Sequence, residues 1–261
     1  MVEHFSLWRT FLVLAAVLAA ATEVGYRLRR WRAGDAPPPA DATPSGIVIS
    51  AVLGLLALLI GFTFSMSIER YDTRRDLVLA EANAIGTVTL RLELLALADF
   101  ERLRPLLIAY ERERLGFYAA GIDEARLAEV HRRTGALQGQ IWDEVTALAR
   151  ANAASRVLPL LIESLNQAFD LATARRVAFE NHTPRSIVLM LIAYAVIVAF
   201  MLSTLIGERR RHQIEIIVLF VLVSLVISLV IDVDAPREGA IRISQAPMAL
   251  LHDSLVERYG R

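Results

Sequence analysis

The 261-residue sequence contains no cysteine and no lysine. Without cysteine the chain has no disulfide, no thiol nucleophile, no thiolate metal site and no iron–sulfur cluster. Its 28 basic and 28 acidic residues balance, so no bulk positive charge points to nucleic acid. Hydrophobic residues make up 55% of the chain and charged residues only 21%. This composition is too apolar for an ordinary soluble domain and excludes a disordered or collagen-like chain.

Signatures of catalysis are also lacking. The sequence has no GxSxG, no P-loop, no HExxH and no dinucleotide-binding fingerprint. The five histidines are scattered without the spacing of metal ligands. We therefore expect a protein that is not an enzyme and that has no cofactor, no metal site and no nucleic-acid partner.

Four stretches are long and apolar enough to cross a bilayer, which requires about 20 mostly apolar residues. They are residues 5–24, 46–68, 186–207 and 214–231. The first is alternatively a cleaved signal peptide, because Ala19–Ala20–Ala21 resembles a cleavage site. The arginines that follow this stretch argue against export, so we predict four transmembrane helices.

Between the second and third spans, apolar residues recur at intervals of three and four, which is the helical period. We predict an all-α fold in which span two continues to about Ala98 and three further helices complete an antiparallel bundle. The second of these bundle helices begins at Asp99 as its cap, and the third begins after Asp123. The predicted organisation is 1–68 (spans one and two, with an Arg/Pro-rich linker 27–45), 69–183 (bundle), 184–234 (spans three and four) and 235–261 (a turn and a short amphipathic helix on the bundle).

The orientation follows from the two short loops, 27–45 and 208–213, which are rich in arginine. The positive-inside rule places such loops in the cytoplasm and the bundle on the other side. The expected location is the inner membrane of the cell, with the lipid bilayer as a partner.

Span two carries the candidate pore residues. Leu56, Ile60 and Phe64 lie at i, i+4 and i+8, with Phe62 close by. In a symmetric oligomer such residues would form stacked hydrophobic rings, which gate by dewetting. Ordinary packing of a membrane helix explains the same spacing.

Polar residues follow this candidate gate. Arg70, Arg74 and Arg75 would line a vestibule and attract small anions, unless they belong to a solvated helix face. Further on, a polar stripe would line a passage or join helices through hydrogen bonds. It consists of Asn83, Thr87 and Arg91.

Six other positions have a structural role in our interpretation, and Glu81 and Gly239 are two of them. Gly86 within a helix suggests that another helix approaches closely. Asp232 and Asp234 lie where span four ends, and we expect ion pairs there, with Arg74, Arg75 or Arg237, rather than a cation site. Pro236 ends the span.

The motifs resemble those of the bacterial bestrophin-like membrane proteins. The likeness rests on Gly61–Phe62–Thr63–Phe64, Arg70–Tyr71–Asp72, Glu81–Ala82–Asn83–Ala84–Ile85–Gly86–Thr87, Asp232–Val233–Asp234–Ala235–Pro236–Arg237–Glu238–Gly239 and Ser244–Gln245–Ala246–Pro247. True bestrophins are pentameric anion channels with four spans per subunit, a hydrophobic neck on span two and a cytosolic helical domain. The resemblance therefore implies a homo-oligomeric anion channel with Phe62 or Phe64 in the neck, and a bundle on the cytosolic side, contrary to the loop charges.

Two functions are compatible with this sequence. The first is an oligomeric ion channel with a hydrophobic gate on span two, anion-conducting by the resemblance. The second is a non-conducting membrane sensor or scaffold whose bundle binds a ligand or a partner protein.

Overall fold

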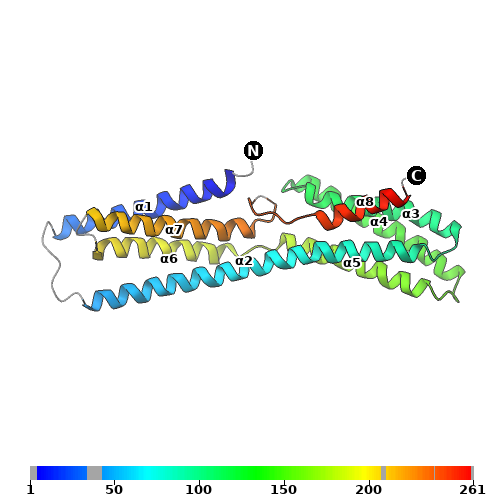
Figure 1. The fold of residues 1–261 in the computed structure, drawn as a ribbon, viewed down its shortest axis with the longest axis horizontal. Helices are drawn as coiled ribbons and strands as arrows, with labels where there is room; N and C mark the ends of the chain where they lie inside the picture. Colours follow the sequence, from blue (N-terminus) through cyan, green and yellow to red (C-terminus); the bar gives the residue numbers. More distant parts are fainter. Residues whose placement is uncertain (1–4, 34–42, 207–209, 238, 260–261) are drawn as a thin grey trace. The chain divides into compact units, whose positions relative to one another are not determined.

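The computed structural model describes residues 5–33, 43–206, 210–237 and 239–259. Within these ranges the chain forms helices and no strands, which confirms the all-α prediction (Figure 1). The helices are α1 (Phe5–Ala33), α2 (Thr43–Leu92), α3 (Leu97–Ala119), α4 (Glu124–Ala151), α5 (Leu158–Glu180), α6 (Arg185–Ile206), α7 (Arg210–Asp234) and α8 (Ala246–Tyr259).

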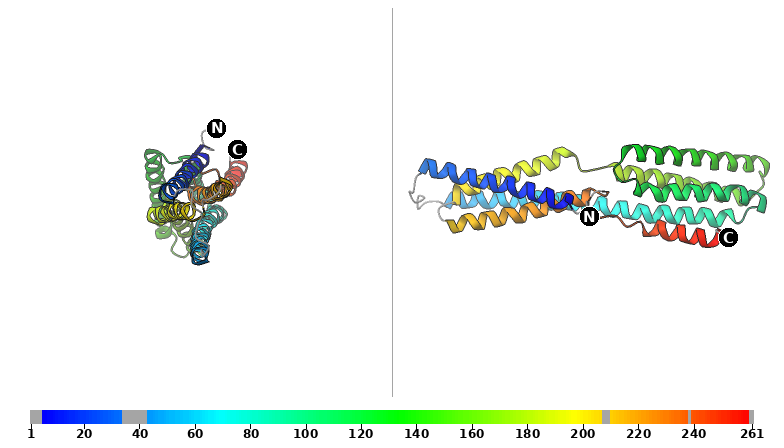
Figure 2. Two further views of the ribbon diagram at one scale, coloured as in Figure 1. Left: turned by 90° about the vertical axis from the view of Figure 1, so that its left-hand side faces the viewer. Right: turned by 90° about the horizontal axis from the view of Figure 1, so that it is seen from above.

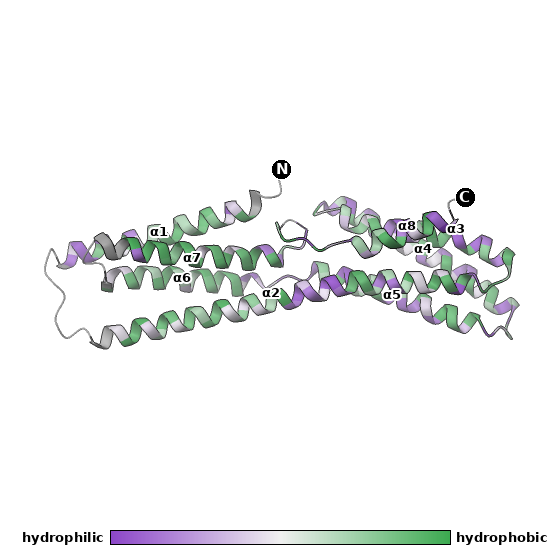
Figure 3. Ribbon diagram, viewed as in Figure 1, coloured by the Kyte–Doolittle hydropathy of each residue, from purple (hydrophilic) through white to green (hydrophobic). Residues whose placement is uncertain are grey.

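The chain divides into two compact units, and the first consists of residues 1–70 and 182–241. Its four helices are long and apolar enough to cross a membrane, as predicted, and Figure 3 shows them as almost continuously hydrophobic. Helix α1 extends to Ala33, so the first arginines of the predicted linker are helical. Residues 34–42 of that linker and Arg209 of the second loop lie outside the described residues.

Close contacts fix α1 against α6 and α7 in the first unit (Figures 1 and 2). The Ser203 hydroxyl donates a hydrogen bond of 2.6 Å to the Thr22 carbonyl oxygen. One turn further along α1, a Cβ on Gly25 would lie 2.6 Å from the Phe200 carbonyl oxygen. The absence of a side chain at residue 25 therefore lets two helix backbones approach each other, as is typical of membrane interfaces.

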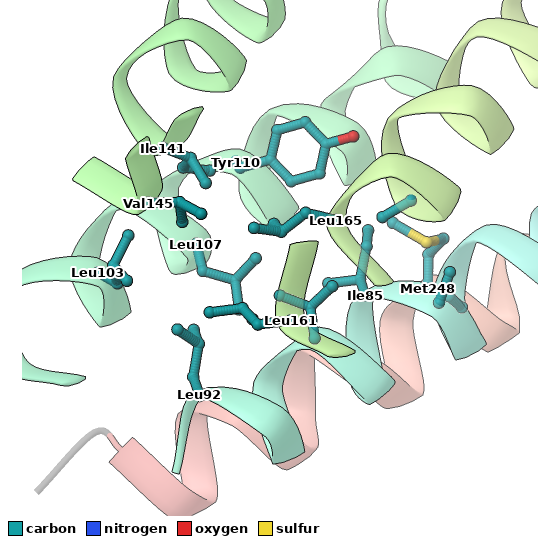
Figure 4. Packing of buried hydrophobic residues seen from close by; sticks show 14 of the residues in the cluster. Ile85, Leu92, Leu103, Leu107, Tyr110, Ile141, Val145, Leu161, Leu165 and Met248 are labelled. Atoms are coloured by element: carbon teal, nitrogen blue, oxygen red, sulfur yellow. The ribbon is translucent and has the colours of Figure 1, made fainter. Parts of the chain in front are cut away.

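The second unit comprises residues 71–181 and 242–261. It contains the second half of α2 together with α3, α4, α5 and α8. In Figure 3 its helices alternate between hydrophobic and hydrophilic residues, as expected for helices that bury one face. Figure 4 shows the buried faces meeting in one apolar core, to which all five helices contribute, for example through Ile85, Leu107, Ile141, Leu161 and Met248.

Two boundaries in this unit differ from the sequence prediction. Helix α2 ends at Leu92 instead of continuing to about Ala98, and a turn separates it from α3. Asp99 is not the N-cap of α3, because the helix begins at Leu97 and Asp99 lies in its first turn. The prediction at Asp123 is confirmed, since its carboxylate accepts hydrogen bonds from the backbone N–H groups of Ala125 and Arg126 at the start of α4.

Candidate functional site

In the first unit, helix α2 exposes a stripe of small residues. Five of them follow one another at intervals of three or four along one helix face: Ser50, Gly54, Ala57, Gly61 and Ser65. A Cβ built on Gly54 or Gly61 would meet no atom within 4 Å. These glycines therefore serve no helix packing within the single chain, and their face is open to lipid or to another copy of the protein.

The candidate gate residues do not share one environment. Leu56 is only 2% exposed and belongs to the apolar core of the first unit, and Ile60 packs partly against that core. Phe62 is 62% exposed and Phe64 is 36% exposed. A single chain thus leaves Phe62, and to a smaller degree Phe64, available to line a space outside it.

Leu58 is a residue that the sequence argument missed. It precedes Phe62 by one helical turn and is 52% exposed, so the two side chains lie on neighbouring positions of the same face. The signal that could have identified it is the pair Gly54 and Gly61, which marks the face of α2 that the chain leaves uncovered.

The three candidate vestibule arginines are distributed over different environments. Arg70 donates to the Thr183 hydroxyl and lies 3.5 Å from the Asp234 carboxylate. Arg74 is completely buried and donates to the carbonyl oxygens of Ala178 and Asn181, at 2.9 and 2.6 Å. Arg75 is the one that is exposed, and it lies 3.6 Å from the Asp76 carboxylate.

Acidic side chains follow the gate on the exposed part of α2. Glu69 lies in the first unit, seven residues after Phe62, and it is exposed. Asp72 and Asp76, at the start of the second unit, are exposed as well. Arg70 and Arg74 are engaged elsewhere, and Arg75 lies beside Asp76, so the exposed charges between residues 69 and 76 are three carboxylates and one guanidinium group.

The acidic pair at the end of α7 has a structural role. The Asp232 carboxylate accepts hydrogen bonds from the N–H groups of Ala240 and Ile241, at 2.9 and 3.0 Å. Gly239 makes the turn possible, because a Cβ there would lie 2.4 Å from the Asp232 carbonyl oxygen. The Asp232 carboxylate therefore anchors the chain that follows Pro236.

Asp234 links two further elements of the same unit. Its carboxylate accepts a hydrogen bond of 2.6 Å from the Thr183 N–H, at the entry to α6, in addition to its pair with Arg70. Arg70 is not among the partners that we name from the sequence. Asp234 thus joins α2, α6 and α7.

Glu81 is completely buried in the second unit, where it holds two arginines. It accepts hydrogen bonds from Arg114 of α3 and from Arg175 of α5, the latter at 2.7 Å. Arg175 also donates to the Gln245 side-chain oxygen, at 2.5 Å. Burial lowers the pKa of Arg175, and the Glu81 charge acts in the opposite direction. The sequence signalled Glu81, but it did not show which arginines it pairs with.

The polar stripe lies along a groove of about 650 Å³ between α2 and α8. Asn83, Thr87 and Gly86 line it, and the Thr87 hydroxyl donates to the Asn83 carbonyl oxygen. Arg91 instead donates to the Leu160 carbonyl oxygen of α5. The atom nearest to a Cβ at Gly86 is a side-chain methyl of Leu251, at 3.6 Å, so no helix backbone approaches this glycine closely.

Two titratable groups of the bundle are buried. Burial raises the pKa of Tyr110 to about 12. Glu111 is also buried, and its pKa is raised by burial although the His252 ring lies 2.9 Å from its carboxylate. Among the described residues no group of three or more histidines, aspartates or glutamates is placed to hold a metal ion.

The comparison with protein families shows to which family the chain belongs. The model of the bestrophin-like domain matches residues 12–248. The chain belongs to the bestrophin-like family. The resemblance seen in the motifs of α2 and of the turn after α7 is thereby confirmed.

Solved structures show the same fold for this bestrophin-like chain. One variant of a bacterial bestrophin homologue from Klebsiella pneumoniae is 15% identical, with a TM-score of 0.73 over 98% of this chain and 99% of the other. Another structure of that homologue is 16% identical, with a TM-score of 0.71 over 96% and 98%. A variant of a membrane protein is 17% identical, with a TM-score of 0.72 over 96% and 98%. No curated protein matches the chain by sequence.

Family membership and the four apolar helices make this bestrophin-like chain a membrane protein. The open face of α2 is consequently surrounded by lipid or by protein. Lipid alone does not require small residues at regular helical intervals, whereas helix association does.

Proposed function

We propose that this bestrophin-like protein is an oligomeric ion channel whose pore is lined by the exposed face of α2. The observation that carries the proposal is the uncovered stripe on this span, with two glycines at which an added Cβ would meet no atom of the described residues within 4 Å. Copies arranged around an axis would cover the small residues and bring the neighbouring large ones together.

The hydrophobic gate of this proposal consists of Leu58 and Phe62. Both side chains are exposed in the single chain and lie one turn apart. Rings of such side chains exclude water from a narrow pore and so block ions until the ring widens. Leu56 is buried and Ile60 is partly buried, so both would pack against the rest of the first unit and hold α2 in place.

The bestrophin resemblance implies small anions as the permeating species, but the exposed charges favour cations. Arg70 and Arg74 donate hydrogen bonds within their own units. After Phe62, α2 exposes three carboxylates and only one arginine, Arg75, which lies beside Asp76. Rings of acidic side chains at a pore mouth concentrate cations. On the charge of α2 we therefore expect cations to permeate better than anions.

Several further features of the proposal follow from the sequence. The resemblance implies a pentamer, and the loop charges place the short Arg-rich loops on the cytoplasmic side of the inner membrane. The resemblance implies the opposite orientation of the bundle. The conduction mechanism is the same in either orientation.

The proposal is tested by ion flux through liposomes that contain the purified full-length protein. We expect a selective flux in the wild type and a larger basal flux in Phe62→Ala, because this substitution widens the proposed ring. Phe64→Ala is the matched control, with the same change two positions away on α2, and it should leave the flux near the wild-type level.

The outcomes separate the competing interpretations. A larger flux in Phe64→Ala than in Phe62→Ala would mean that the gate is formed by the other face of α2, which carries Leu56, Ile60 and Phe64. The absence of flux from folded, oligomeric protein would exclude the channel and leave the non-conducting sensor. The reversal potential in a salt gradient gives the sign of the ion, and Glu69→Gln combined with Asp76→Asn should shift it towards anions.

A further inference from the structure

A polar pocket of about 140 Å³ lies between α3, α4 and α5 of the helical bundle. It shares no lining residue with the groove beside α2, and none of its lining residues belongs to the proposed gate. Most of the side chains that line it can donate hydrogen bonds: Arg114, His131, Thr134, Gln138, Thr173 and Arg176. None of the described residues that line the pocket is acidic.

One buried group in this pocket lacks a partner. Thr134 is only 7% exposed, and its hydroxyl is buried without a hydrogen bond to any described residue. A buried hydroxyl without a partner is costly, and most such groups in folded proteins are satisfied. Thr134 is one of the residues that line the pocket, so a group bound there lies next to the side chain that lacks a partner.

The charge around the pocket is positive. Arg114 is buried and shares the single carboxylate of Glu81 with Arg175, so two buried cations face one buried anion. Part of the excess charge is accommodated by the ring of Phe117, whose centroid lies 5.0 and 5.3 Å from the two guanidinium carbons. Arg176 adds a further cation at the exposed side of the pocket.

Helix α4 forms one wall of the pocket and has a glycine there, so no side chain of that residue fills the space. Gly135 of α4 lines it, and a Cβ at this position would meet no atom within 4 Å. Glycine within a helix is less favourable than alanine by up to about 1 kcal/mol. Here its small size preserves the space next to Thr134.

We propose that this pocket binds a small oxyanion of the size of phosphate or sulfate. The Thr134 hydroxyl and the Gln138 amide donate to the anion from the buried side, and Arg176 donates from the exposed side. Charged hydrogen bonds of this kind are the strongest that a protein offers to an anion. The site is a binding site in the bundle and does not depend on whether the chain conducts ions.

The test is titration calorimetry of the full-length protein in detergent with sodium phosphate and with sodium sulfate. Sodium chloride at the same ionic strength controls for screening of the surface charge. We expect saturable binding of one oxyanion per chain and a raised unfolding temperature. Chloride should produce neither effect.

Matched variants locate the site. Arg176→Gln should weaken binding at least about tenfold, because it removes a charged donor, whereas Arg150→Gln changes an exposed arginine of α4 outside the pocket and should leave the affinity unchanged. Gly135→Leu should abolish binding by filling the pocket. Gly139→Leu, one turn further along α4 and also in open space, should not.

Three results would overturn the proposal. The first is that phosphate and sulfate give no saturable heat with folded wild-type protein. The second is that chloride stabilises the protein equally. The third is that each variant in the pocket behaves like its control. Because none of these measurements involves flux, failure of the oxyanion site is distinguishable from failure of the channel.

Discussion

The replacement of Glu81 by glutamine tests whether one buried carboxylate holds the bundle together. Glu81 is completely buried and accepts hydrogen bonds from Arg114 and Arg175, which are buried as well. Glutamine has the same shape but no charge, so two guanidinium groups would remain buried without an anion. Breaking a buried ion pair in this way costs about 3–5 kcal/mol.

This cost is large compared with the stability of a folded protein, which is about 5–15 kcal/mol. A destabilisation of 1 kcal/mol lowers the unfolding temperature of a chain of this size by about 2–4 °C. Glu81→Gln should therefore lower it by about 6–20 °C. The measurement is thermal unfolding of the purified protein in detergent, followed by circular dichroism.

A matched control distinguishes burial from the mere loss of an ion pair. Glu101 lies 2.9 Å from Arg104 on the surface of α3, and exposed pairs contribute less than about 1 kcal/mol. Glu101→Gln should therefore have a small effect. Adding Arg175→Met to Glu81→Gln should restore part of the lost stability, because it removes one of the two unpaired cations.

If Glu81→Gln destabilises the protein no more than Glu101→Gln does, the buried carboxylate does not hold the bundle together. If Arg175→Met adds its full cost to that of Glu81→Gln, the two side chains act independently and do not form the proposed ion pair.

Two further predictions concern other parts of the fold. Gly25→Ala should destabilise the protein, because its Cβ would lie 2.6 Å from the Phe200 carbonyl oxygen. Gly139→Ala, in open space, should instead stabilise the protein by up to about 1 kcal/mol. Equal unfolding temperatures of the two variants would contradict the close contact between α1 and α6. The raised pKa of Tyr110 predicts alkaline sensitivity, because the folded chain retains a proton up to about pH 12 that the unfolded chain releases near pH 10.0. The stabilisation is complete below pH 10.0 and is lost as the pH rises towards 12, by about 1.4 kcal/mol per pH unit. Tyr110→Phe should flatten this loss in unfolding measurements between pH 9 and pH 12, and parallel curves for variant and wild type would show that Tyr110 is not its source.

The sequence by itself determined the membrane helices and the kinship of the chain. A run of about 20 apolar residues has few alternatives to a bilayer span, because its backbone polar groups must be satisfied internally. The helical period located the bundle, and Asp123 marked the start of α4 because an N-cap is a local interaction between a side chain and the next two or three N–H groups. The motifs of α2 and of the turn after α7 indicated the family.

Local patterns did not determine the end of α2 or the start of α3. The turn after Leu92 separates two segments that are both favourable to helix, and α3 begins at Leu97 rather than at Asp99. Helix propensity is a weak signal that tertiary contacts readily override.

Only the tertiary structure decided which face of each helix is covered. A spacing of four makes Leu56–Ile60 and Leu58–Phe62 equivalent as sequence patterns, yet Leu56 is buried and Leu58 is exposed because of what packs beside them. The same holds for Arg70 and Arg74, whose partners Thr183, Ala178 and Asn181 lie more than 100 residues away in the chain. Such contacts depend on how distant segments fold together, and no periodicity in the sequence records them.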